Sequence, residues 1–473
     1  MSDRQRLEHF FAVAIKAVRG DTVLKKYLWV DTEPNQRRAL VFSRGSVHLQ
    51  WALPPPGGRL RLIALGKAAL AMAEGALSVL SQANLDSSLD AVLIITKELP
   101  AKDQLDKEIT RTRSQLGSRC QLMQGGHPVA DERSLRAGQT LLEWVANSGE
   151  RDRYLILLSG GASALAVKPI EGISLAAKTA WVQRLMQAGA AIDELNLLRR
   201  YLSRLKGGGL ARAMAPASHL TLAISDVPGD DPRVIGSAPT LDYAAEPDAV
   251  RALFERYGFE PPRDRPASPV AVSQATPQAA YAVIARLDDA LEAVGEVGQR
   301  LGYRFINMGR VFYGDVHAHV HDFCETLRAQ SAALSQREVA CLVVAAGEPR
   351  LTLSLDPAQL TLGEGAGGRA QHFALLCARE LQGIAGVTVL AAGTDGSDGP
   401  TSAAGACVDG TTWAAIQAAG MEPQQALDHY RSHPALASVG ALFTTGATGT
   451  NVADLFLGIV RCGDRDESDR EIR

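Results

Sequence analysis

One arrangement recurs along the chain: a short apolar run, then a loop of small and polar residues, then apolar residues at helical spacing. The segments that carry it are 61–77, 154–167, 219–232, 339–353 and 387–406, and 90–98 adds one more buried-type apolar run. Continuous apolar strands that alternate with helices are typical of parallel sheets covered on both faces. The sequence therefore predicts an α/β fold, in which ligands bind beyond the carboxyl ends of the strands.

The pattern is interrupted once, which indicates a domain boundary. A segment rich in Pro, Arg and Asp occupies 245–272, and helical spacing of apolar residues resumes over 278–295. We expect an N-terminal domain over 1–245, a connector or insertion with helices over 246–335, a C-terminal α/β domain over 336–462 and a frayed tail over 463–473.

Composition and charge exclude several classes of protein. The 473 residues are 46% hydrophobic and 21% charged, with a formal net charge of -3, so we expect no nucleic-acid or anionic-membrane partner. No apolar stretch reaches the roughly 18 residues of a membrane helix, and the amino-terminal residues lack a signal pattern. The six cysteines form no C-x-x-C pair, which indicates reduced thiols in the cytoplasm.

The loop at 159–165, SGGASAL, follows a predicted strand and precedes residues compatible with a helix. Gly160 and Gly161 allow the backbone to approach an anion, Ser159 and Ser163 add hydroxyl donors, and a helix start adds free N–H groups. The loop is neither a Walker A loop nor a G-x-G-x-x-G fingerprint. A structural tight turn explains it equally well.

Segment 192–211 predicts a helix with two faces. Asp193 is a plausible N-cap, and Gly207 begins a glycine stop. The leucines at 195, 198, 202 and 205 form a buried stripe, while the polar residues at the same spacing are Asn196, Arg199, Ser203 and Lys206. This polar face is either solvated or a cation-rich stripe that delivers Lys206 to a phosphate.

Acidic residues follow two of the predicted strands. Asp226, Asp230 and Asp231 come after the apolar run at 219–224, and Asp395 and Asp398 come after the run at 387–393. Mg²⁺ prefers carboxylate oxygens and is commonly held by one or two of them together with nucleotide phosphates. Asp and Gly in tight turns would explain the same segments. We favour a metal site formed from Asp226, Asp230 and Asp395.

Three further features carry candidate chemistry. Arg369 stands where a glycine-rich loop runs into a helix, and Lys67 directly follows the strand at 61–65. In 444–460, Thr450 or Asn451 would cap a following helix, whose start would cradle an anion together with Thr448. His317, His319 and His321 alternate, but they lack a glutamate or cysteine that would complete a metal motif, so an ordinary helix start is the preferred interpretation.

Taken together these segments resemble the type II, MOFRL-containing glycerate kinases, members of which have also been labelled hydroxypyruvate reductases. The segments that carry the resemblance are LGKAALAMAEGA (65–76), GGHPVADERSLRAG (125–138), SGGASAL (159–165), AIDELNLLRRYLSRLKGGGLA (191–211), ISDVPGDDPRVIGSAPT (224–240), GEPRLTL (347–353), GGRAQHFAL (367–375), GTDGSDGPTSAAGA (393–406) and TGATGTNVADL (445–455). Their order and spacing make the match specific, and it covers nearly the whole chain.

The resemblance implies two unequal α/β domains, the N-terminal one Rossmann-like with a mostly parallel sheet, the C-terminal one of MOFRL type, and an active site in the interdomain cleft. It also implies ATP and Mg²⁺ as cofactors and D-glycerate as the substrate, giving 2-phospho-D-glycerate and ADP. By that similarity Lys67 and Arg369 are the leading catalytic cations, with Asp226 as a candidate base. Asn196 and Arg199 would join them in binding the acceptor, and a homodimer is compatible with the sequence.

The chain departs from the family pattern at several positions. The family has GGRNQE where Ala370 and His372 stand in GGRAQH, and it has Glu-Ala where the helix near His317 begins. It also has glycine at Ala162 and Ala238, and proline at Ala447. Arg369 is retained while its neighbours change, so phosphoryl transfer to an altered acceptor, a related short sugar acid, is an alternative.

Two other classes of function stay open. A hydroxypyruvate reductase would follow the older label, but no G-x-G-x-x-G follows the first strand with an acidic residue about 20 positions on. A non-catalytic sensor of sugar acids or phosphosugars is the second alternative. Five separate loops suited to anions exceed what a sensor requires.

Overall fold

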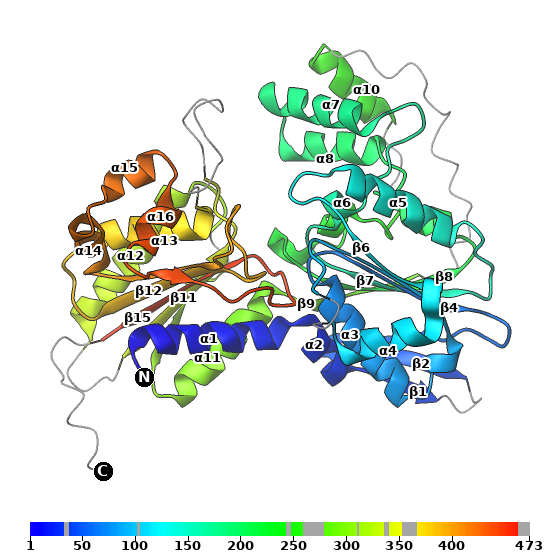
Figure 1. Ribbon diagram of the computed structural model, residues 1–473, viewed down its shortest axis with the longest axis horizontal. Coiled ribbons are helices and arrows are strands. Elements are labelled where there is room, and N and C mark those ends of the chain that lie inside the picture. The colour runs from blue at the N-terminus through cyan, green and yellow to red at the C-terminus, as the bar shows by residue number, and fades with distance from the viewer. Residues whose placement is uncertain are drawn as a thin grey trace. The chain divides into compact units, whose positions relative to one another are not determined.

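The computed structural model describes residues 1–32, 37–101, 105–242, 247–258, 279–309, 312–334, 340–351 and 367–461. The chain forms two compact units, Arg19–Ala285 and a second one that joins Met1–Val18 to Arg286–Arg473 (Figure 1). We call them the 19–285 unit and the 286–473 unit and describe each by itself. The expectation of an active site between two domains therefore stays a prediction, and the predicted tail at 463–473 lies outside the described residues.

The units divide the predicted connector. The first helix, α1 (Asp3–Val18), packs on α11 (Leu287–Arg300) and so belongs to the 286–473 unit, whereas β9 (Ala280–Ala285) pairs with β8 (Ser218–Ile224) in the 19–285 unit. Residues 259–272 of the predicted insertion lie outside the described residues.

The 19–285 unit contains a six-stranded sheet in which every pair of neighbours is parallel. Its order is β6-β5-β4-β7-β8-β9. The strands not yet given are β4 (Leu60–Leu65), β5 (Leu89–Thr96), β6 (Cys120–Gln124) and β7 (Arg153–Leu158). The predicted strands are confirmed here, and the order is the Rossmann one, with its reversal between β4 and β7.

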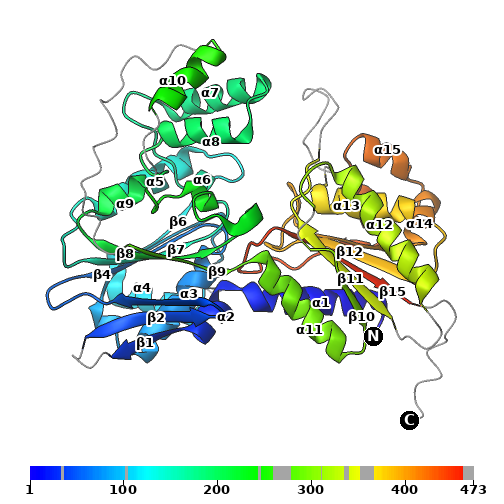
Figure 2. The ribbon, with the colours of Figure 1, turned by 180° about the vertical axis from the view of Figure 1, so that it is seen from behind.

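Helices cover both faces of this sheet. On one face lie α3 (Ala69–Gln82) and α4 (Lys107–Leu116), and on the other α5 (Glu132–Val145) and α6 (Ala162–Leu165) (Figures 1 and 2). The remaining helices are α2 (Gly20–Tyr27), α7 (Leu175–Gln187), α8 (Ile192–Tyr201), α9 (Gly209–Met214) and α10 (Pro247–Arg256). A separate small core joins α7, α8 and α10 through Leu185, Leu198 and Phe254.

Two features of this unit differ from the sequence analysis. An antiparallel sheet of β1 (Leu28–Thr32), β2 (Arg38–Arg44) and β3 (Val47–Ala52) was not predicted. The helical pattern assigned to 278–295 is wrong for its first part, because β9 occupies Ala280–Ala285 as an edge strand. The apolar run AYAVIA is too short for its periodicity to separate a strand from a helix.

The 286–473 unit contains a mixed sheet of order β10-β11-β15-β12-β13-β14. Its strands are β10 (Arg304–Asn307), β11 (Cys341–Gly347), β12 (Val387–Gly393), β13 (Gly405–Asp409), β14 (Leu442–Phe443) and β15 (Asp454–Val460). Only β10 and β11 are parallel neighbours, so the parallel pairing expected from the recurring strand pattern does not extend to most of this sheet. Since β11 and β12 both run antiparallel to β15, their carboxyl ends still reach the same edge.

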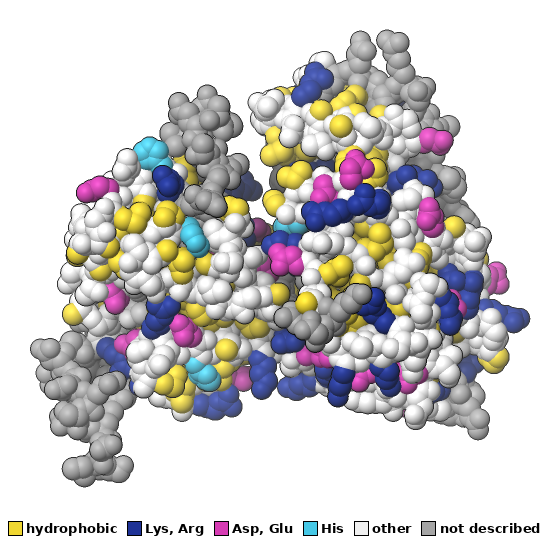
Figure 3. Space-filling model, in the orientation of Figure 1, with side chains coloured by type: hydrophobic (Ala, Val, Ile, Leu, Met, Phe, Trp, Pro, Cys, Tyr) yellow, Lys and Arg dark blue, Asp and Glu magenta, His cyan; other side chains and the backbone are white. Residues whose placement is uncertain are grey.

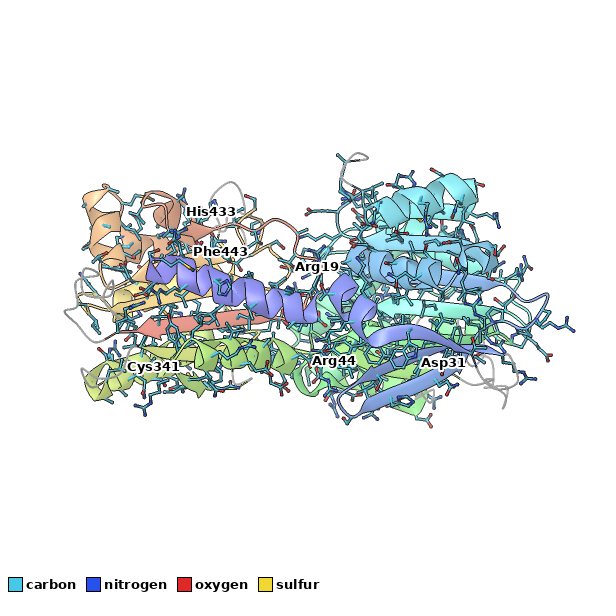
Figure 4. All side chains as sticks on the ribbon, turned by 90° about the horizontal axis from the view of Figure 1, so that it is seen from below. Arg19, Asp31, Arg44, Cys341, His433 and Phe443 are labelled. Carbon is cyan, nitrogen blue, oxygen red and sulfur yellow. The ribbon has the colours of Figure 1, made fainter. Side chains whose placement is uncertain are left out.

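The helices of this unit form a layer on each face of the sheet. One face is covered by α1 and α11, and the other by α12 (Val316–Ala333) and α13 (Arg369–Glu380) (Figure 1). Phe443 lies beside α1 (Figure 4), where its ring meets Phe11 edge-on at 5.2 Å between centroids. The remaining helices are α14 (Thr412–Ala418), α15 (Pro423–Asp428) and α16 (Ser432–Ala437).

Segment 452–460 was expected to be a helix and is instead the strand β15. Every residue of DLFLGIV is buried, and the strand pairs with β11 on one side and β12 on the other. A short apolar run that is buried on both faces favours a central strand. The anion cradle predicted at the start of that helix therefore does not exist. None of the described helices is both long and apolar enough to cross a membrane.

Candidate active site

The loops after β4 and β7 meet at the point where the strand order of the parallel sheet reverses. Leu65 is in register with Leu158, so Gly66 and Lys67 leave the sheet beside Ser159 and Gly160. Open α/β sheets bind ligands outside the carboxyl ends of their strands at this reversal. Two of the sequence-predicted segments therefore lie together at the ligand-binding edge of the fold.

Hydrogen bonds hold these two loops against each other. The Lys67 N–H donates to the Gly160 carbonyl at 2.9 Å, and the Ala68 N–H donates to the buried Ser159 hydroxyl at 3.0 Å. Ser159 thus has a structural role, since its Oγ accepts a backbone hydrogen bond from the loop that carries Lys67. Lys67 itself is half-buried, with its backbone fixed.

Gly66 is required for this close approach. A Cβ at Gly66 would lie 2.1 Å from Ser159 Oγ and 2.6 Å from the Ser159 carbonyl oxygen, and the backbone φ of Gly66 is +133°. Any L-residue would therefore both collide and adopt a conformation that side chains rarely tolerate. The close contact with Ser159 and the positive φ therefore explain why a glycine precedes Lys67.

His127 also belongs to this group, and sequence reasoning did not single it out. A Cβ on Gly161, whose φ is +82°, would lie 3.1 Å from Lys67 Cγ and 3.1 Å from His127 Cδ2. The glycine therefore leaves room for both side chains. The segment GGHPVADERSLRAG (125–138) entered the sequence analysis only as part of the family resemblance. The position of His127 just beyond the end of β6 could have identified it as a candidate.

The helix predicted after 192 is shorter than expected. α8 ends at Tyr201, because the next residues leave it: the Leu202 carbonyl accepts from Ile170 N–H and Ser203 bridges to Pro169. Its N-cap is Ala191, whose N–H donates to Glu194, so the assignment of Asp193 as the cap is wrong.

The leucine stripe of 195–205 is confirmed, since all four leucines are buried. Asn196 and Arg199 lie on α8, where the guanidinium donates to the Asn196 side-chain oxygen at 3.3 Å. Lys206 stands in the turn after the helix and is buried, not on the helical face that was expected. Burial lowers the pKa of Lys206 well below its ordinary value, and the charges of Lys178 and Arg199 lower it further.

The turn that carries Lys206 connects with the switch-point loops. The Gly207 N–H donates to the Ser237 carbonyl at 3.0 Å, and a Cβ on the adjacent Gly236 would lie 3.2 Å from Ala162 Cβ. Ala162 begins α6 directly after Gly161, and Ser163 on this helix is half-buried. Since α6 is one turn long, its dipole adds little to an anion site, and the glycine backbone is the more important part.

One departure from the family pattern, Ala238, lies in a turn beside Lys206. Ala238 adopts φ +51° and Ser237 φ +63°, both in the left-handed region where glycine is favoured. The Ala238 carbonyl accepts from Gly208 N–H at 2.8 Å, so this strained turn positions the segment beside Lys206. The alanine at 238 is therefore accommodated at the cost of local backbone strain.

Asp226 and Asp230 follow β8, the neighbour of β7. Leu158 is in register with Ala223, so Asp226 leaves the sheet beside the 159–161 loop. Asp226 and Asp230 are both half-buried, and Asp230 has φ +54°. Asp231 differs, because its carboxylate pairs with Arg233 at 3.0 Å and lies in its own local turn.

In the 286–473 unit, Arg369 begins α13, as predicted, and is held by two carboxylates. Its Nε contacts Asp454 Oδ2 at 2.5 Å, its Nη2 contacts Asp454 Oδ1 at 3.2 Å, and its Nη1 lies 2.8 Å from Glu348. Burial alone would lower the pKa of Arg369, but the charges of Asp454 and Glu348 outweigh it and raise the pKa above the ordinary value. The guanidinium has five N–H groups, and contacts with these two carboxylates account for three of them among the described residues.

Asp398 caps α13 from the loop after β12. It accepts from Ala370 N–H at 3.1 Å and from Gln371 N–H at 2.8 Å. Burial raises the pKa of Asp398 to about 6, the nearby Asp454 adds to the effect, and these N–H donors oppose it. This side chain is a structural cap of the helix that carries Arg369.

Asp395, Thr448 and Asn451 lie at the same edge of this sheet. The Asp395 carboxylate accepts from Ser397 N–H at 3.0 Å, and the Thr448 hydroxyl donates to the Thr394 carbonyl at 2.5 Å. Asn451 is buried just before β15. Thr448 therefore ties two loops together, and its expected place at a helix start is not observed.

The departures at His317 and His372 lie against each other, with ring centroids 5.9 Å apart. Both ring nitrogens of His372 are buried without a hydrogen-bond partner among the described residues, and burial lowers its pKa to about 4. Ala370 is buried, Ala447 is exposed, and His321 is exposed on α12. His372 is therefore a neutral packing residue, and its ring stacks on that of Tyr430.

The predicted metal residues are split between the units: Asp226 and Asp230 belong to one and Asp395 to the other. No group of three or more His, Cys, Asp or Glu side chains in the described part of the chain is arranged to hold a metal ion. A Mg²⁺ ion that is held mainly by nucleotide phosphates needs only one or two carboxylates. The position of Asp226 beside the 159–161 loop fits that donor set.

Comparison with known proteins gives the family. A model for the domain of unknown function DUF4147 matches residues 6–272, and the MOFRL family model matches residues 341–454. The D-glycerate 2-kinase of Thermotoga maritima is 35% identical over 85% of this chain and 91% of its own length. A protein of Agrobacterium vitis named as a hydroxypyruvate reductase is 34% identical over 85% of this chain and 87% of its own.

The solved structures agree with the sequence relatives. The crystal structure of glycerate kinase from Thermotoga maritima superposes with a TM-score of 0.71 at 29% sequence identity, covering 97% of this chain and all of that one. Since both family models and the relatives together span most of the sequence, the chain belongs to the glycerate kinase family that combines a DUF4147 domain with a MOFRL domain.

Proposed function

We propose that this chain is an ATP-dependent kinase that phosphorylates the 2-hydroxyl of D-glycerate, giving 2-phospho-D-glycerate and ADP. The observation that carries the proposal is the 35% identity to a D-glycerate 2-kinase over 91% of that protein. A match of this extent includes both compact units, so it applies to the whole enzyme and not to a shared nucleotide-binding module.

Phosphoryl transfer depends on positioning and charge neutralisation more than on covalent chemistry by the protein. Lys67 satisfies the positional requirement, because the Gly160 carbonyl and the Ser159 hydroxyl fix the backbone of its loop. We assign its ammonium group to the transferring phosphoryl oxygens. Gly160 and Gly161 let those oxygens approach the backbone, and the His127 ring bounds the same space.

Mg²⁺ would neutralise the nucleotide phosphates when bound. Asp226 is the residue that we propose for holding it, since it leaves β8 next to the glycine loop, with Asp230 four residues on. Asp226 or Asp395 would accept the proton of the acceptor hydroxyl.

Arg369 is proposed as the second cation of the reaction. The two carboxylates that hold it fix the direction of its planar fork, and the two N–H groups that these carboxylates do not engage would donate to an oxyanion. Asp454 has only 4% of its side chain exposed, so removing Arg369 would bury an unpaired carboxylate. Because this alone costs about 3–5 kcal/mol, loss of activity in an Arg369 variant would mix catalysis with folding.

The competing reductase and sensor functions are less well supported. The first loop of the parallel sheet is Gly66-Lys67-Ala68-Ala69, which places an alanine, Ala68, where a dinucleotide fingerprint places its second glycine. On the face shown in Figure 3, Lys and Arg side chains are interspersed with Asp and Glu, so no broad basic surface favours a nucleic-acid partner there. We place the enzyme in the cytoplasm, where the five free cysteines of the described residues stay reduced.

Purified protein is expected to release ADP from ATP and Mg²⁺ only when a short hydroxy acid is added, with D-glycerate giving the highest kcat/KM among such acids. In the absence of coupling enzymes, it should not oxidise NADH with hydroxypyruvate. NADH oxidation without ADP release would contradict the kinase assignment, and a higher kcat/KM with another short sugar acid would change the acceptor while keeping phosphoryl transfer.

Lys67→Met should lower kcat by about 10²–10³, the usual effect of removing one preorganised charge-stabilising group. The matched control is Lys97→Met, because Lys97 follows the neighbouring strand β5 at the same edge but away from the switch point. Thermal melting of both variants should remain within a few degrees of the parent. Near-normal turnover of Lys67→Met would remove this residue from the reaction.

Asp226→Asn should raise the Mg²⁺ concentration for half-maximal activity by about tenfold or more, since one carboxylate ligand is lost. Asp231→Asn is the control: that carboxylate is already paired with Arg233 and should leave the Mg²⁺ dependence unchanged. If the two variants behave alike, Asp226 does not hold the ion.

A further inference from the structure

A cluster of three cations lies in the 19–285 unit, and one of its members was not anticipated. Lys178 comes from the first turn of α7, Arg199 from α8, and Lys206 from the turn after α8. Lys178 and Lys206 are only 7% and 8% exposed. The three are close enough for their charges to influence one another, since Arg199 and Lys178 both act on Lys206 and Arg199 acts on Lys178.

The cluster has no counter-charge in the part of the chain that the structure describes. The Lys178 Nζ is fully buried without a hydrogen-bond partner, and no described Asp or Glu forms an ion pair with any of the three residues. The contact found for Arg199 is with the neutral amide of Asn196. Burying an unpaired ammonium group costs several kcal/mol, so such an arrangement needs an anion to offset it.

Repulsion and burial both act on Lys178. Burial, together with the smaller effect of the Arg199 charge, lowers its pKa to about 8. An ammonium group whose pKa is lower in the folded than in the unfolded chain destabilises the fold while it stays protonated. For Lys178 this loss of folding stability is fully present below about pH 8 and disappears as the pH rises from about 8 to 10.5. A bound anion would offset this cost at neutral pH.

The position of the cluster connects it to the proposed active site. Lys206 precedes Gly207, which donates to Ser237, and Gly236 packs against Ala162 at the end of the 159–161 loop. The turn that carries Lys206 therefore adjoins the carboxyl edge of the parallel sheet on which Lys67 lies. A carboxylate carries one negative charge, whereas a phosphoryl group carries up to two and offers three oxygens to three separate donors.

We propose that Lys178, Arg199 and Lys206 form one binding site for a phosphoryl group, with the buried ammonium group of Lys178 as one of its ligands. The inference rests on the proposed phosphotransferase function only for the origin of that group, which is either the polyphosphate of the nucleotide or the phosphate of the phosphorylated hydroxy acid. The chemistry is the same in both cases.

The test measures binding by calorimetry of the full-length protein with four probes: inorganic phosphate, ADP, 2-phospho-D-glycerate and D-glycerate. Lys178→Met should weaken the binding of inorganic phosphate by about 10- to 100-fold, the effect expected for one hydrogen bond to a charged group. Lys107→Met, an exposed lysine at the start of α4, is the matched control and should bind phosphate like the parent.

Selective weakening for ADP would assign the group to the nucleotide, and selective weakening for 2-phospho-D-glycerate would assign it to the product. Weakening for D-glycerate alone would overturn the proposal, because the cluster would then bind a carboxylate. Unchanged phosphate binding in Lys178→Met, or no phosphate binding by the parent, would also overturn it. Loss of phosphate binding in a protein that fails to phosphorylate glycerate would support the site and reject the proposed substrate.

Two further measurements, proton uptake and melting temperature, distinguish a Lys178 that binds phosphate from a Lys178 with only a structural role. At pH 8 about half of the Lys178 side chains are neutral, so phosphate binding should take up protons, and Lys178→Met should reduce that uptake. Without ligand, Lys178→Met should melt at the same temperature as the parent or higher, because an unpaired buried charge is replaced by an apolar chain of similar length. A lower melting temperature together with unchanged proton uptake would indicate a structural role.

Discussion

The parallel pairing of β4 with β7 determines most of what this molecule can do. It reverses the strand order of the sheet and brings the loop after each strand to the same place. The approach is so close that only glycine fits at position 66. The Ser159 hydroxyl holds the two loops together by accepting a hydrogen bond from the Ala68 N–H. Lys67 is consequently presented from a backbone with little freedom. A preorganised cation of this kind stabilises developing charge without reorganisation during the reaction.

Charge is arranged differently in the two compact units. In the 19–285 unit, Lys178 and Lys206 are buried without a carboxylate among the described residues, so the folded protein carries a cost that an anionic ligand can remove. In the 286–473 unit, Arg369 is surrounded by carboxylates, and Asp398 beneath it caps the helix on which it lies. The first arrangement is suited to an anionic ligand, and the second fixes the direction of one guanidinium group.

The sequence predicted the parts of this structure that depend on local pattern. Strands β4, β5, β7 and β8 are long apolar runs followed by polar loops, and Lys67, Ser159 and Asp226 follow from their positions alone. The prediction failed where tertiary contacts decide. β15 is apolar enough for either a strand or a helix, and only its two neighbours make it a strand. Lys178 was not identified because its burial depends on the packing of α7 against α8, which no local pattern records.

The central claim concerns which oxygen of the acceptor receives the phosphoryl group, and phosphorus NMR of the product answers it directly. After incubation of the enzyme with ATP, Mg²⁺ and D-glycerate, the monoester phosphorus should couple to the single proton on C2 and appear as a doublet. Transfer to the primary hydroxyl would couple it to two methylene protons and give a triplet. The triplet, or the absence of any new monoester resonance, would contradict the assignment of this chain as a glycerate 2-kinase.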